Sequence, residues 1–584
     1  MLGAMIPASS LEKEDPRIPC GQESGMQVRK ADVLVIGSGG AGVMAAVEAE
    51  RAGASVIIVS KEPLGYGDTR ISLGVMSVSP DPAIGDSEEA FVEDMIRGGD
   101  HLNDPGLVRV LVRGAMDAAI NFEGFGHIFS RDDNGVLKRL ELPPGGHRAS
   151  RAILSPGVGI SMGHAIRSAA ARARSLVLEE TLCSELLVCD GEVVGAQALQ
   201  IATGEPIALL AKCTIVAAGG AGALYYPHTD CMPAVVGDSF SLGLAAGAEL
   251  VDMEQVQFIP FGITHPPAML GAPCGEPAMA GPFGRLLNNK GAVVLENIMP
   301  MTRAQVARII VEEIRKGGAT PHGGLLLDQR PNLESPSGQF FVTLLKKMGG
   351  PFLDIVRTAY GEKAANLEEP WDVLPSSHYN MGGLKTDEWC RTCVPALYAC
   401  GQAQGGVMGG NRLGSTSLTE IFVFGKRAGR TAAGEAKGRR LAEEGVARQA
   451  IEKLKSLRGS RGASRPIVLK RALQRLMWEK LGPLRDGPGI EDALQGIQSI
   501  RGKAKDLCTS AVKPCNAELT DAIELTHMLA AAEAITISAL ERRESRGAHV
   551  RSDFPARDDE NPVQNMVVQM RGSQCRVRRV EAGR

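Results

Sequence analysis

Short apolar runs recur along the chain, most of them followed by or ending in glycine, and predict the buried strands of a parallel sheet. The first covers residues 33–36 and the next covers 55–59, with an Ala-rich amphipathic stretch at 43–51 between them. Further runs at 213–222 and 396–401 also end in glycines. Strand, helix and strand within about 30 residues form a β-α-β unit. The pattern therefore predicts an α/β fold organised around residues 31–61.

The remaining pattern predicts two more domains. One helical stretch is expected at 87–123. Residues 251–372 are Pro-rich loops and β segments with one clear helix at 302–316, which indicates an inserted domain. A strand at 396–401 and a helix at 417–435 return to the first domain. Helical periodicity dominates residues 465–551, and the charged end from 552 on is expected to be extended.

The glycines of the first unit indicate dinucleotide binding. Gly37, Gly39 and Gly42 form G-x-G-x-x-G between the first strand and its helix. Such glycines allow a tight turn, close approach of a pyrophosphate and close helix–strand packing. A structural glycine turn is the alternative. The second strand ends in Ser60 and Lys61 rather than in the acidic residue that normally holds a ribose hydroxyl, so the ribose must be bound differently.

Asp238 is a further candidate because it precedes the helical run 240–247. It could cap that helix or contact a ribose, and the sequence leaves both open.

Composition narrows the class. The 584 residues carry a net charge of −3 and 44% hydrophobic residues, so we expect neither a nucleic-acid surface nor a polyanion partner. No apolar run reaches the length of about 18 that spans a bilayer. Residues 1–22 lack a targeting signal, so we expect a cytoplasmic protein.

The pair Cys390 and Cys393 lacks a second C-x-x-C or a His cluster, so a hairpin tip is favoured over redox or metal chemistry, and no metal site is expected.

Several separated motifs together resemble one family. They are VIGSGGAG, AAGGAGALY, GDSFSLGLAAGAELVDMEQVQF, HYNMGG, ALYACGQ, GGNRLGSTSL with FGKRAG, and ESRGAH with RDDEN. From about residue 31 to 561 the chain resembles the flavoprotein subunits of fumarate reductase and succinate dehydrogenase, with L-aspartate oxidase as a close relative.

The resemblance implies a Rossmann-like FAD-binding domain, an inserted α+β capping domain and a C-terminal helical domain. The boundaries we expect are an N-terminal arm at 1–27, the FAD-binding domain at 28–250 and 375–437, the capping domain at 251–374, the helical domain at 438–551 and an extended tail at 552–584. Many members attach FAD through a His, where this chain has Asp68, so non-covalent FAD is expected.

The resemblance also assigns the cofactor contacts. Gln402 replaces a Glu that binds the ribityl chain in the family, and an amide can still hydrogen-bond hydroxyls. The expected contacts are Gly37, Gly39, Gly40, Ala41, Gly42, Ser60, Lys61, Thr69, Gly74, Ala218, Gly219, Gly220, Asp238, Gly401, Gln402, Arg412, Ser415, Ser417 and Leu418.

Three residues match the family's catalytic positions. Arg303 matches the proton donor of a reaction that exchanges hydride between flavin and a C–C bond. A surface Arg at a helix start is the alternative, but a cation gains nothing from the helix dipole there. His378 and Arg412 match the pair that binds one substrate carboxylate, for which an Arg fork is well suited. A core His or a structural Arg is the alternative reading of those two.

The other half of the expected substrate pocket departs from the family. His-Pro-Thr-Gly is replaced by a segment with Ile259 and Phe261, and the following Arg-containing segment becomes EPAMAGPFG at 276–284, in which Glu276 realigns only in part. The two replacements remove polar partners of a second carboxylate, each worth about 1.5–3 kcal/mol. We therefore expect one carboxylate or carbonyl near His378 and Arg412 and an apolar or thioester-like arm near Ile259 and Phe261. A fumarate or succinate enzyme with rearranged ligands is the alternative.

Three functions remain open. The first is a flavoprotein subunit that passes electrons to an iron–sulfur partner and acts on a small organic acid or acyl substrate. The second is an oxidase of the L-aspartate oxidase type. The third is a non-catalytic FAD electron-relay subunit of a larger complex.

Overall fold

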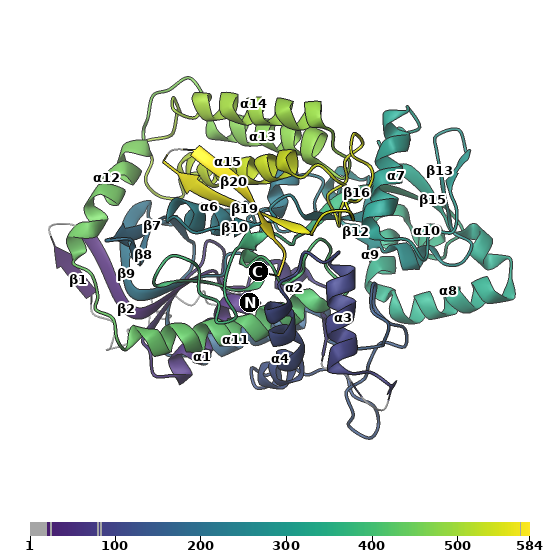
Figure 1. Ribbon diagram of the computed structural model, residues 1–584, viewed down its shortest axis with the longest axis horizontal. Helices are drawn as coiled ribbons and strands as arrows, with labels where there is room; N and C mark the ends of the chain where they lie inside the picture. Colours follow the sequence, from purple (N-terminus) through teal and green to yellow (C-terminus); the bar gives the residue numbers. More distant parts are fainter. Residues whose placement is uncertain (1–19, 24–25, 79–80, 82–83, 573, 584) are drawn as a thin grey trace, which may run out of the picture.

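The computed structural model describes residues 20–23, 26–78, 81, 84–572 and 574–583. Figure 1 shows three parts: a central sheet with its helices, a domain to one side that contains α7 to α10, and a layer of helices above the sheet. The expected fold class is confirmed. The N-terminal arm lies almost wholly outside the described residues.

The central sheet has eight strands in the order β6-β3-β2-β9-β8-β7, with β1 beside β2 and β18 beside β9. Five strands run parallel to one another: β6, β3, β2, β9 and β18. At the edge of the sheet, β8 pairs antiparallel with β9 and forms a hairpin with β7. Their bounds are Cys20–Glu23 (β1), Met26–Ile36 (β2), Val56–Val59 (β3), Leu176–Leu178 (β6), Thr181–Cys189 (β7), Glu192–Gln200 (β8), Glu205–Val216 (β9) and Leu397–Ala399 (β18).

Helices α1 (Gly40–Arg51) and α11 (Thr416–Ala436) pack against each other on this sheet. Their contact is close because glycines face it: a Cβ on Gly429 would lie 2.1 Å from the carbonyl oxygen of Ala45. The other elements of this part are α2 (Asp68–Ile71), β4 (Val75–Ser77), α3 (Glu88–Gly98), α4 (Pro105–Glu123), β5 (Ala152–Leu154), α5 (Val158–Arg172) and α6 (Asp238–Ala245).

The helical stretch expected at 87–123 consists of two helices, α3 and α4. A new helix begins at Pro105, whose fixed φ suits a first helical position, and the carboxylate of Asp104 caps it by accepting from the N–H groups of Gly106 and Leu107.

The inserted domain contains an antiparallel sheet in the order β12-β11-β16-β15-β13-β14. Two long strands, β11 (Val256–Ile263) and β16 (Trp371–Asn380), connect it to the central part. The other elements are β12 (Pro273–Gly275), β13 (Arg285–Leu287), β14 (Val293–Leu295), α7 (Arg303–Arg315), β15 (Leu325–Asp328), α8 (Pro336–Met348), α9 (Gly350–Tyr360) and α10 (Glu362–Ala365).

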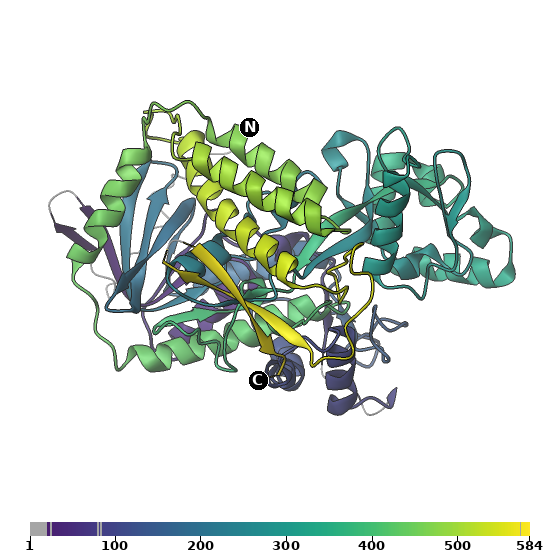
Figure 2. The ribbon, with the colours of Figure 1, turned by 45° about the horizontal axis from the view of Figure 1, so that its top comes forward.

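The helical domain consists of α12 (Arg448–Leu457), α13 (Pro466–Leu481), α14 (Gly487–Lys503) and α15 (Ala517–Glu541). Figure 2 shows α13, α14 and α15 side by side across the face of the molecule. Within the described residues, α15 is the one helix long and apolar enough to cross a membrane, and 72% of its most apolar window is buried. A helix in a protein core passes the same test.

The C-terminal tail ends in a hairpin, β19 (Gln564–Arg571) and β20 (Gln574–Glu581). It completes a sheet in the order β17-β10-β19-β20 with β10 (Leu250–Val251) and β17 (Gly383–Leu384). The tail therefore returns to the two segments where the chain enters and leaves the inserted domain.

Candidate active site

The turn between β2 and α1 requires its glycines. Gly37 has φ +112°, and a Cβ there would lie 2.3 Å from the carbonyl oxygen of Ala217 on the next strand. A Cβ on Gly42 would lie 2.0 Å from the carbonyl oxygen of Gly37. Gly39 precedes the helix, and a Cβ there would meet nothing closer than Oγ1 of Thr69 at 4.0 Å, so the space in front of the helix N-terminus stays open for a ligand.

A cavity of about 1220 Å³ runs from this turn to the inserted domain. Most of the expected cofactor contacts line it: Gly37, Gly39, Gly40, Ala41, Ser60, Lys61, Thr69, Gly74, Ala218, Gly219, Asp238, Gln402, Arg412, Ser415, Ser417 and Leu418. Three others stand behind the wall. Gly42 packs against Gly37, and Gly401 packs against Ala41. Gly220 packs against the side chains of Asn380 and Gln402.

Asp238 does not cap α6, because Gly237 occupies the N-cap and no side chain caps it. Its carboxylate instead accepts from Nζ of Lys61 at 2.8 Å and from Nδ1 of His527 at 2.6 Å. Burial would raise the pKa of Asp238, but the charges and hydrogen bonds of Lys61 and His527 together outweigh burial and hold that pKa well below its usual range. Lys61 also reaches Glu524 of α15 at 2.7 Å, so this end of the cavity is tied to the helical domain.

The cavity fits a polar cofactor. Nε2 of Gln402 is buried and has no partner among the described residues, and Gln402 lines the cavity. Buried donors are nearly always paired, so this amide indicates a missing acceptor such as a sugar-like hydroxyl. Together with the open helix N-terminus at Gly39, it matches what FAD requires.

Arg303 is the first residue of α7 and lies on the cavity wall. Thr302 fixes the helix start, because its hydroxyl accepts from the N–H of Gln305 while the side chain of Gln305 accepts in return. Nε of Arg303 donates to Glu276 at 2.7 Å in a two-pronged ion pair, and Nη1 donates to Oε1 of Gln257 at 2.5 Å. Burial would raise the pKa of Glu276, but the charge of Arg303 lowers it.

Glu276 is therefore a site residue that the sequence identified only in part. Its signal was that it is the acidic first residue of the rewritten segment 276–284. In the structure Glu276 accepts hydrogen bonds from Arg303 with both carboxylate oxygens, although the Arg that the family has in that segment is absent.

His378 and Arg412 contact each other directly. Nη2 of Arg412 lies 2.7 Å from Nε2 of His378, and Nδ1 of His378 lies 2.6 Å from Oδ2 of Asp230. A guanidinium can only donate, so Nε2 accepts and the ring proton is on Nδ1, which donates to Asp230. Sequence reasoning missed Asp230, which no motif marked. Burial, with the nearby charge of Arg303, lowers the pKa of Arg412 to about 10.

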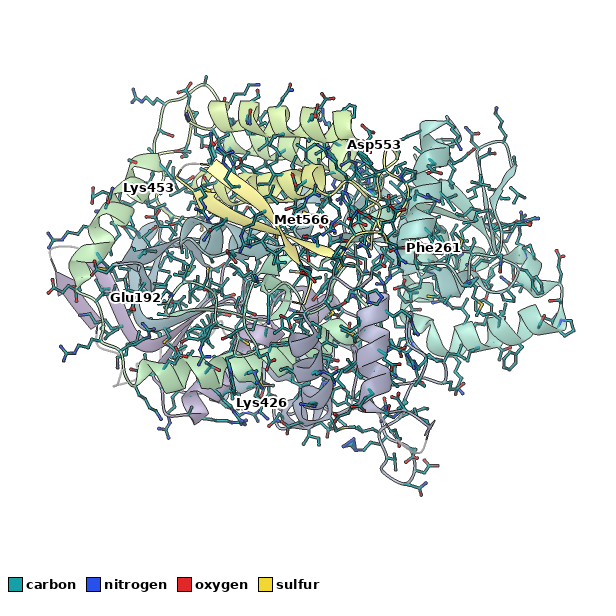
Figure 3. All side chains as sticks on the ribbon, viewed as in Figure 1. Glu192, Phe261, Lys426, Lys453, Asp553 and Met566 are labelled. Atoms are coloured by element: carbon teal, nitrogen blue, oxygen red, sulfur yellow. The ribbon has the colours of Figure 1, made fainter. Side chains whose placement is uncertain are left out.

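Ile259 lines the cavity, but the expectation that Phe261 does so is wrong. Phe261 is fully buried in the core of the inserted domain, where Figure 3 labels it. The register of β11 against β16 shifts between Ile259 and Gly262, so two residues that alternation would place on one face diverge.

Asp68 stands beside this group. Its carboxylate accepts from the N–H of Met232 at 2.8 Å. Burial, with the nearby charge of Asp230, raises the pKa of Asp68 to about 6. A carboxylate at this position cannot form the family's histidyl link to FAD.

The two cysteines of the C-x-x-C differ in exposure, since Cys390 is buried and Cys393 is exposed. Arg391, between them, forms an antiparallel bridge with Tyr398. No group of three or more His, Cys, Asp or Glu residues that could hold a metal ion occurs in the described part of the chain.

Comparison with known proteins identifies the family. The FAD binding domain family matches residues 32–418, and the family described as fumarate reductase flavoprotein C-term matches 470–582. The chain belongs to the fumarate reductase and succinate dehydrogenase flavoproteins. It is 36% identical to a fumarate reductase (CoM/CoB) subunit of Methanothermobacter marburgensis, over 91% of this chain and 95% of that protein.

Other relatives agree. The fumarate reductase flavoprotein subunit of Escherichia coli is 30% identical over 92% of this chain and 91% of that protein. A solved mutant of Escherichia coli quinol fumarate reductase superposes with a TM-score of 0.85 at 27% identity, covering 96% and 97% of the two chains. The protein is thus an FAD-dependent oxidoreductase of the group that acts on CH–CH bonds.

Proposed function

We propose that this chain is the flavin-bearing subunit of an oxidoreductase that reduces or forms a C–C double bond next to one carboxylate or equivalent carbonyl. The observation that carries the proposal is the meeting of Arg303 and Arg412 on one cavity wall. Gln257 joins them, since its Oε1 accepts from Arg303 and its Nε2 donates to the carbonyl oxygen of Arg412. Nε of Arg412 is buried and has no hydrogen-bond partner among the described residues. Buried donors are nearly always paired, so this N–H is available to an anion such as a substrate carboxylate.

FAD, held along the turn at Gly37, would supply the hydride acceptor or donor. The chain's own residues would do the rest. Arg412 fixes the substrate carboxylate, Arg303 delivers or takes the proton at the neighbouring carbon, and Glu276 returns the proton to Arg303. Since Asp68 replaces the linking His, the cofactor would be bound without a covalent bond.

The far wall of the cavity favours a substrate with an apolar arm. Methionine, phenylalanine and aliphatic side chains of the inserted domain line it, where a second carboxylate would otherwise find donors. They are Ile259, Met269, Met279, Met301, Phe341, Leu345, Phe352 and Ile355. Burying an unpaired carboxylate against such a wall costs several kcal/mol, so plain fumarate or succinate is not the proposed substrate.

The electrons would pass to an iron–sulfur subunit in the cytoplasm. Two observations support a multisubunit complex: residues 470–582 match the fumarate reductase C-terminal family, and the 36% identical relative is itself one subunit of its enzyme. Iron and acid-labile sulfide in the complex purified through this chain test that part. The non-catalytic and L-aspartate oxidase alternatives are supported less, since the Arg303–Glu276 pair is complete and the second carboxylate lacks polar partners.

The substrate proposal is tested with the FAD-loaded protein and reduced viologen as electron donor. We expect crotonate and longer 2-enoates to be reduced faster than fumarate. Arg303→Gln should lower the rate by at least about 10²-fold, the usual contribution of a general acid. Arg308→Gln is the matched control, because Arg308 lies on the same helix and pairs with Glu312. Rapid, tight reduction of fumarate by the native protein would refute the proposal.

A further inference from the structure

The cavity wall next to Arg412 contains a carboxylate that the proposed reaction does not use. Asp230 lines the cavity, and its side chain is 8% exposed. Its polar partners among the described residues are Nδ1 of His378 at 2.6 Å and the thiol of Cys231, 3.8 Å from Oδ1. No cation is among these contacts, so its negative charge is not cancelled locally.

The imidazole between Asp230 and Arg412 is neutral while this chain of hydrogen bonds is made. Nε2 of His378 accepts from Arg412, so the ring carries one proton, which it donates to Asp230. His378 therefore transmits the position of Asp230 to Arg412 without adding a positive charge of its own.

The charges around the reacting end are balanced. Arg303 forms a direct ion pair with Glu276. Arg412 and Asp230 are separated by the ring of His378, which hydrogen-bonds both. Asp68, nearby, ionises with a pKa of about 6 because burial and Asp230 oppose its charge. A site built for a dicarboxylate would hold a surplus of cations, and these groups provide none.

We propose that Asp230 is a specificity-determining residue: its charge restricts the site to substrates that bring one negative charge, and its hydrogen bond through His378 orients Arg412. The inference rests on the proposed function, since it concerns the same site. A monoanion meets Arg412 and the apolar wall. The second carboxylate of a dianion would be repelled by Asp230, and no guanidinium would remain to pair with it, because Arg303 is bound to Glu276 and Arg412 holds the first carboxylate.

Butyrate and succinate are the probes, because both are four-carbon acids and differ by one carboxylate. Their binding to the FAD-loaded chain is followed by the perturbation of the flavin absorbance. We expect the native protein to bind butyrate more tightly than succinate. Asp230→Asn keeps an oxygen that can accept from Nδ1 of His378 and removes the charge, so it should shift the preference about tenfold toward succinate.

Two further variants separate charge from position. Asp230→Ala removes the hydrogen bond as well, and we expect it to weaken the binding of both acids relative to Asp230→Asn. Asp117→Asn removes an exposed carboxylate that pairs with Lys426 on the surface, and the preference should stay unchanged.

The outcomes are distinct from those of the proposed function. A native protein that prefers succinate, or an Asp230→Asn variant that keeps the native preference, overturns the role of Asp230 even if 2-enoates are reduced. If no enoate is reduced and neither acid perturbs the flavin, the proposed function itself fails.

Discussion

Glu420 is a buried acid beneath the site, and its ionisation has a measurable cost. It lies on α11, is 1% exposed and accepts a hydrogen bond from the hydroxyl of Tyr379, which lines the cavity. Burial raises the pKa of Glu420 to about 8. The folded state therefore keeps this proton where the unfolded chain, with a pKa near 4.5, has lost it. Stability falls as the pH rises between these two values.

Glu420→Gln should remove that cost, because the amide oxygen can still accept from Tyr379. We expect the midpoint of thermal unfolding to rise, and to rise more at about pH 8 than at about pH 5, by an amount equivalent to a few kcal/mol. A gain of equal size at both pH values would contradict this.

Glu435 provides the control. It lies on the same helix and also accepts from a tyrosine hydroxyl, that of Tyr398, but it pairs with Arg391 as well. Burial would raise its pKa, yet Tyr398 and Arg391 lower it. Glu435→Gln should therefore destabilise the protein at about pH 8 and less at low pH, the opposite sign to Glu420→Gln.

The sequence predicted which residues line the cavity where a motif fixed the backbone, and it did not predict those whose side chains reach in from elsewhere. Gly37 and Arg303 follow from local patterns, since a turn and a helix start are decided within a few residues. Asp230 contacts His378 only because β16 places that residue beside it, 148 residues along the chain. Phe261 was misplaced because a register shift in β11 depends on its pairing with β16.

At the scale of elements, the start of α7 carries Arg303, the proposed proton donor. The capping box of Thr302 and Gln305 decides where the helix begins and therefore where that guanidinium stands. Thr302→Ala should cost about 1 kcal/mol, the usual value of a lost N-cap. Without the cap the first turn of α7, and with it the guanidinium of Arg303, is held less firmly. We expect enoate reduction to slow severalfold, because a small misplacement of a catalytic group lowers the rate.

Ser87→Ala is the matched control for Thr302→Ala. Ser87 caps α3 by accepting from the N–H of Ala90, and it is exposed. The two variants should lower the unfolding temperature alike, but only Thr302→Ala should slow the reaction, and Thr302→Ser should restore it. Equal rates in both alanine variants would mean that the cap does not position Arg303.

Helix and strand types followed from periodicity, whereas their ends and partners did not. The helix predicted at 302–316 is α7, because amphipathic spacing is a local signal. The sequence left open whether Asp238 caps α6 or contacts a ribose, and it could not show that its partner His527 lies on α15, packed against α6.

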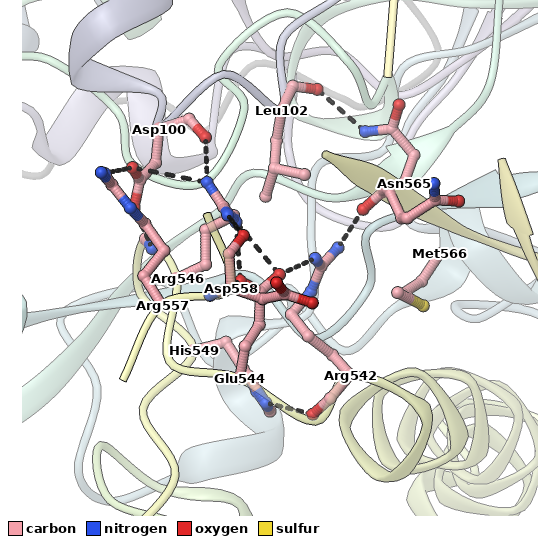
Figure 4. Close-up of polar contacts among 12 residues, drawn as sticks. Asp100, Leu102, Arg542, Glu544, Arg546, His549, Arg557, Asp558, Asn565 and Met566 are labelled. Carbon is pink, nitrogen blue, oxygen red and sulfur yellow. Dashed lines mark hydrogen bonds and ion pairs between the residues drawn. The ribbon is translucent and has the colours of Figure 1, made fainter. Parts of the chain in front are cut away.

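At the scale of the whole molecule, one buried ionic network joins the three parts of the fold. Figure 4 shows Arg542, Glu544, Arg546 and their partners between the helical domain and the C-terminal tail. Arg542, at the end of α15, donates to Asp252 at 3.1 Å, Glu254 at 2.7 Å and Glu544 at 3.0 Å. Asp252 and Glu254 lie where the chain passes from β10 into the inserted domain.

Arg542 is the cation that pairs with both Asp252 and Glu254, whereas Glu544 is also paired with Arg546. Burial and the charge of Glu254 already raise the pKa of Asp252 to about 7. Arg542→Met should leave buried carboxylates without a cation and destabilise the protein by about 3–5 kcal/mol. Without Arg542 the pKa of Asp252 should rise further. The folded state then binds protons that the unfolded chain has released, so the loss should be larger at about pH 8 than at about pH 5.5.

Denaturant midpoints at the two pH values measure this difference. Arg579→Met is the control, since Arg579 is 48% exposed and pairs with Glu541 near the same end of α15. It should change stability by less than about 1 kcal/mol at either pH. If Arg542→Met lost no more stability at the higher pH, the carboxylates around it would have to be protonated in the native protein, and the joint between the three domains would be held by packing rather than by charge.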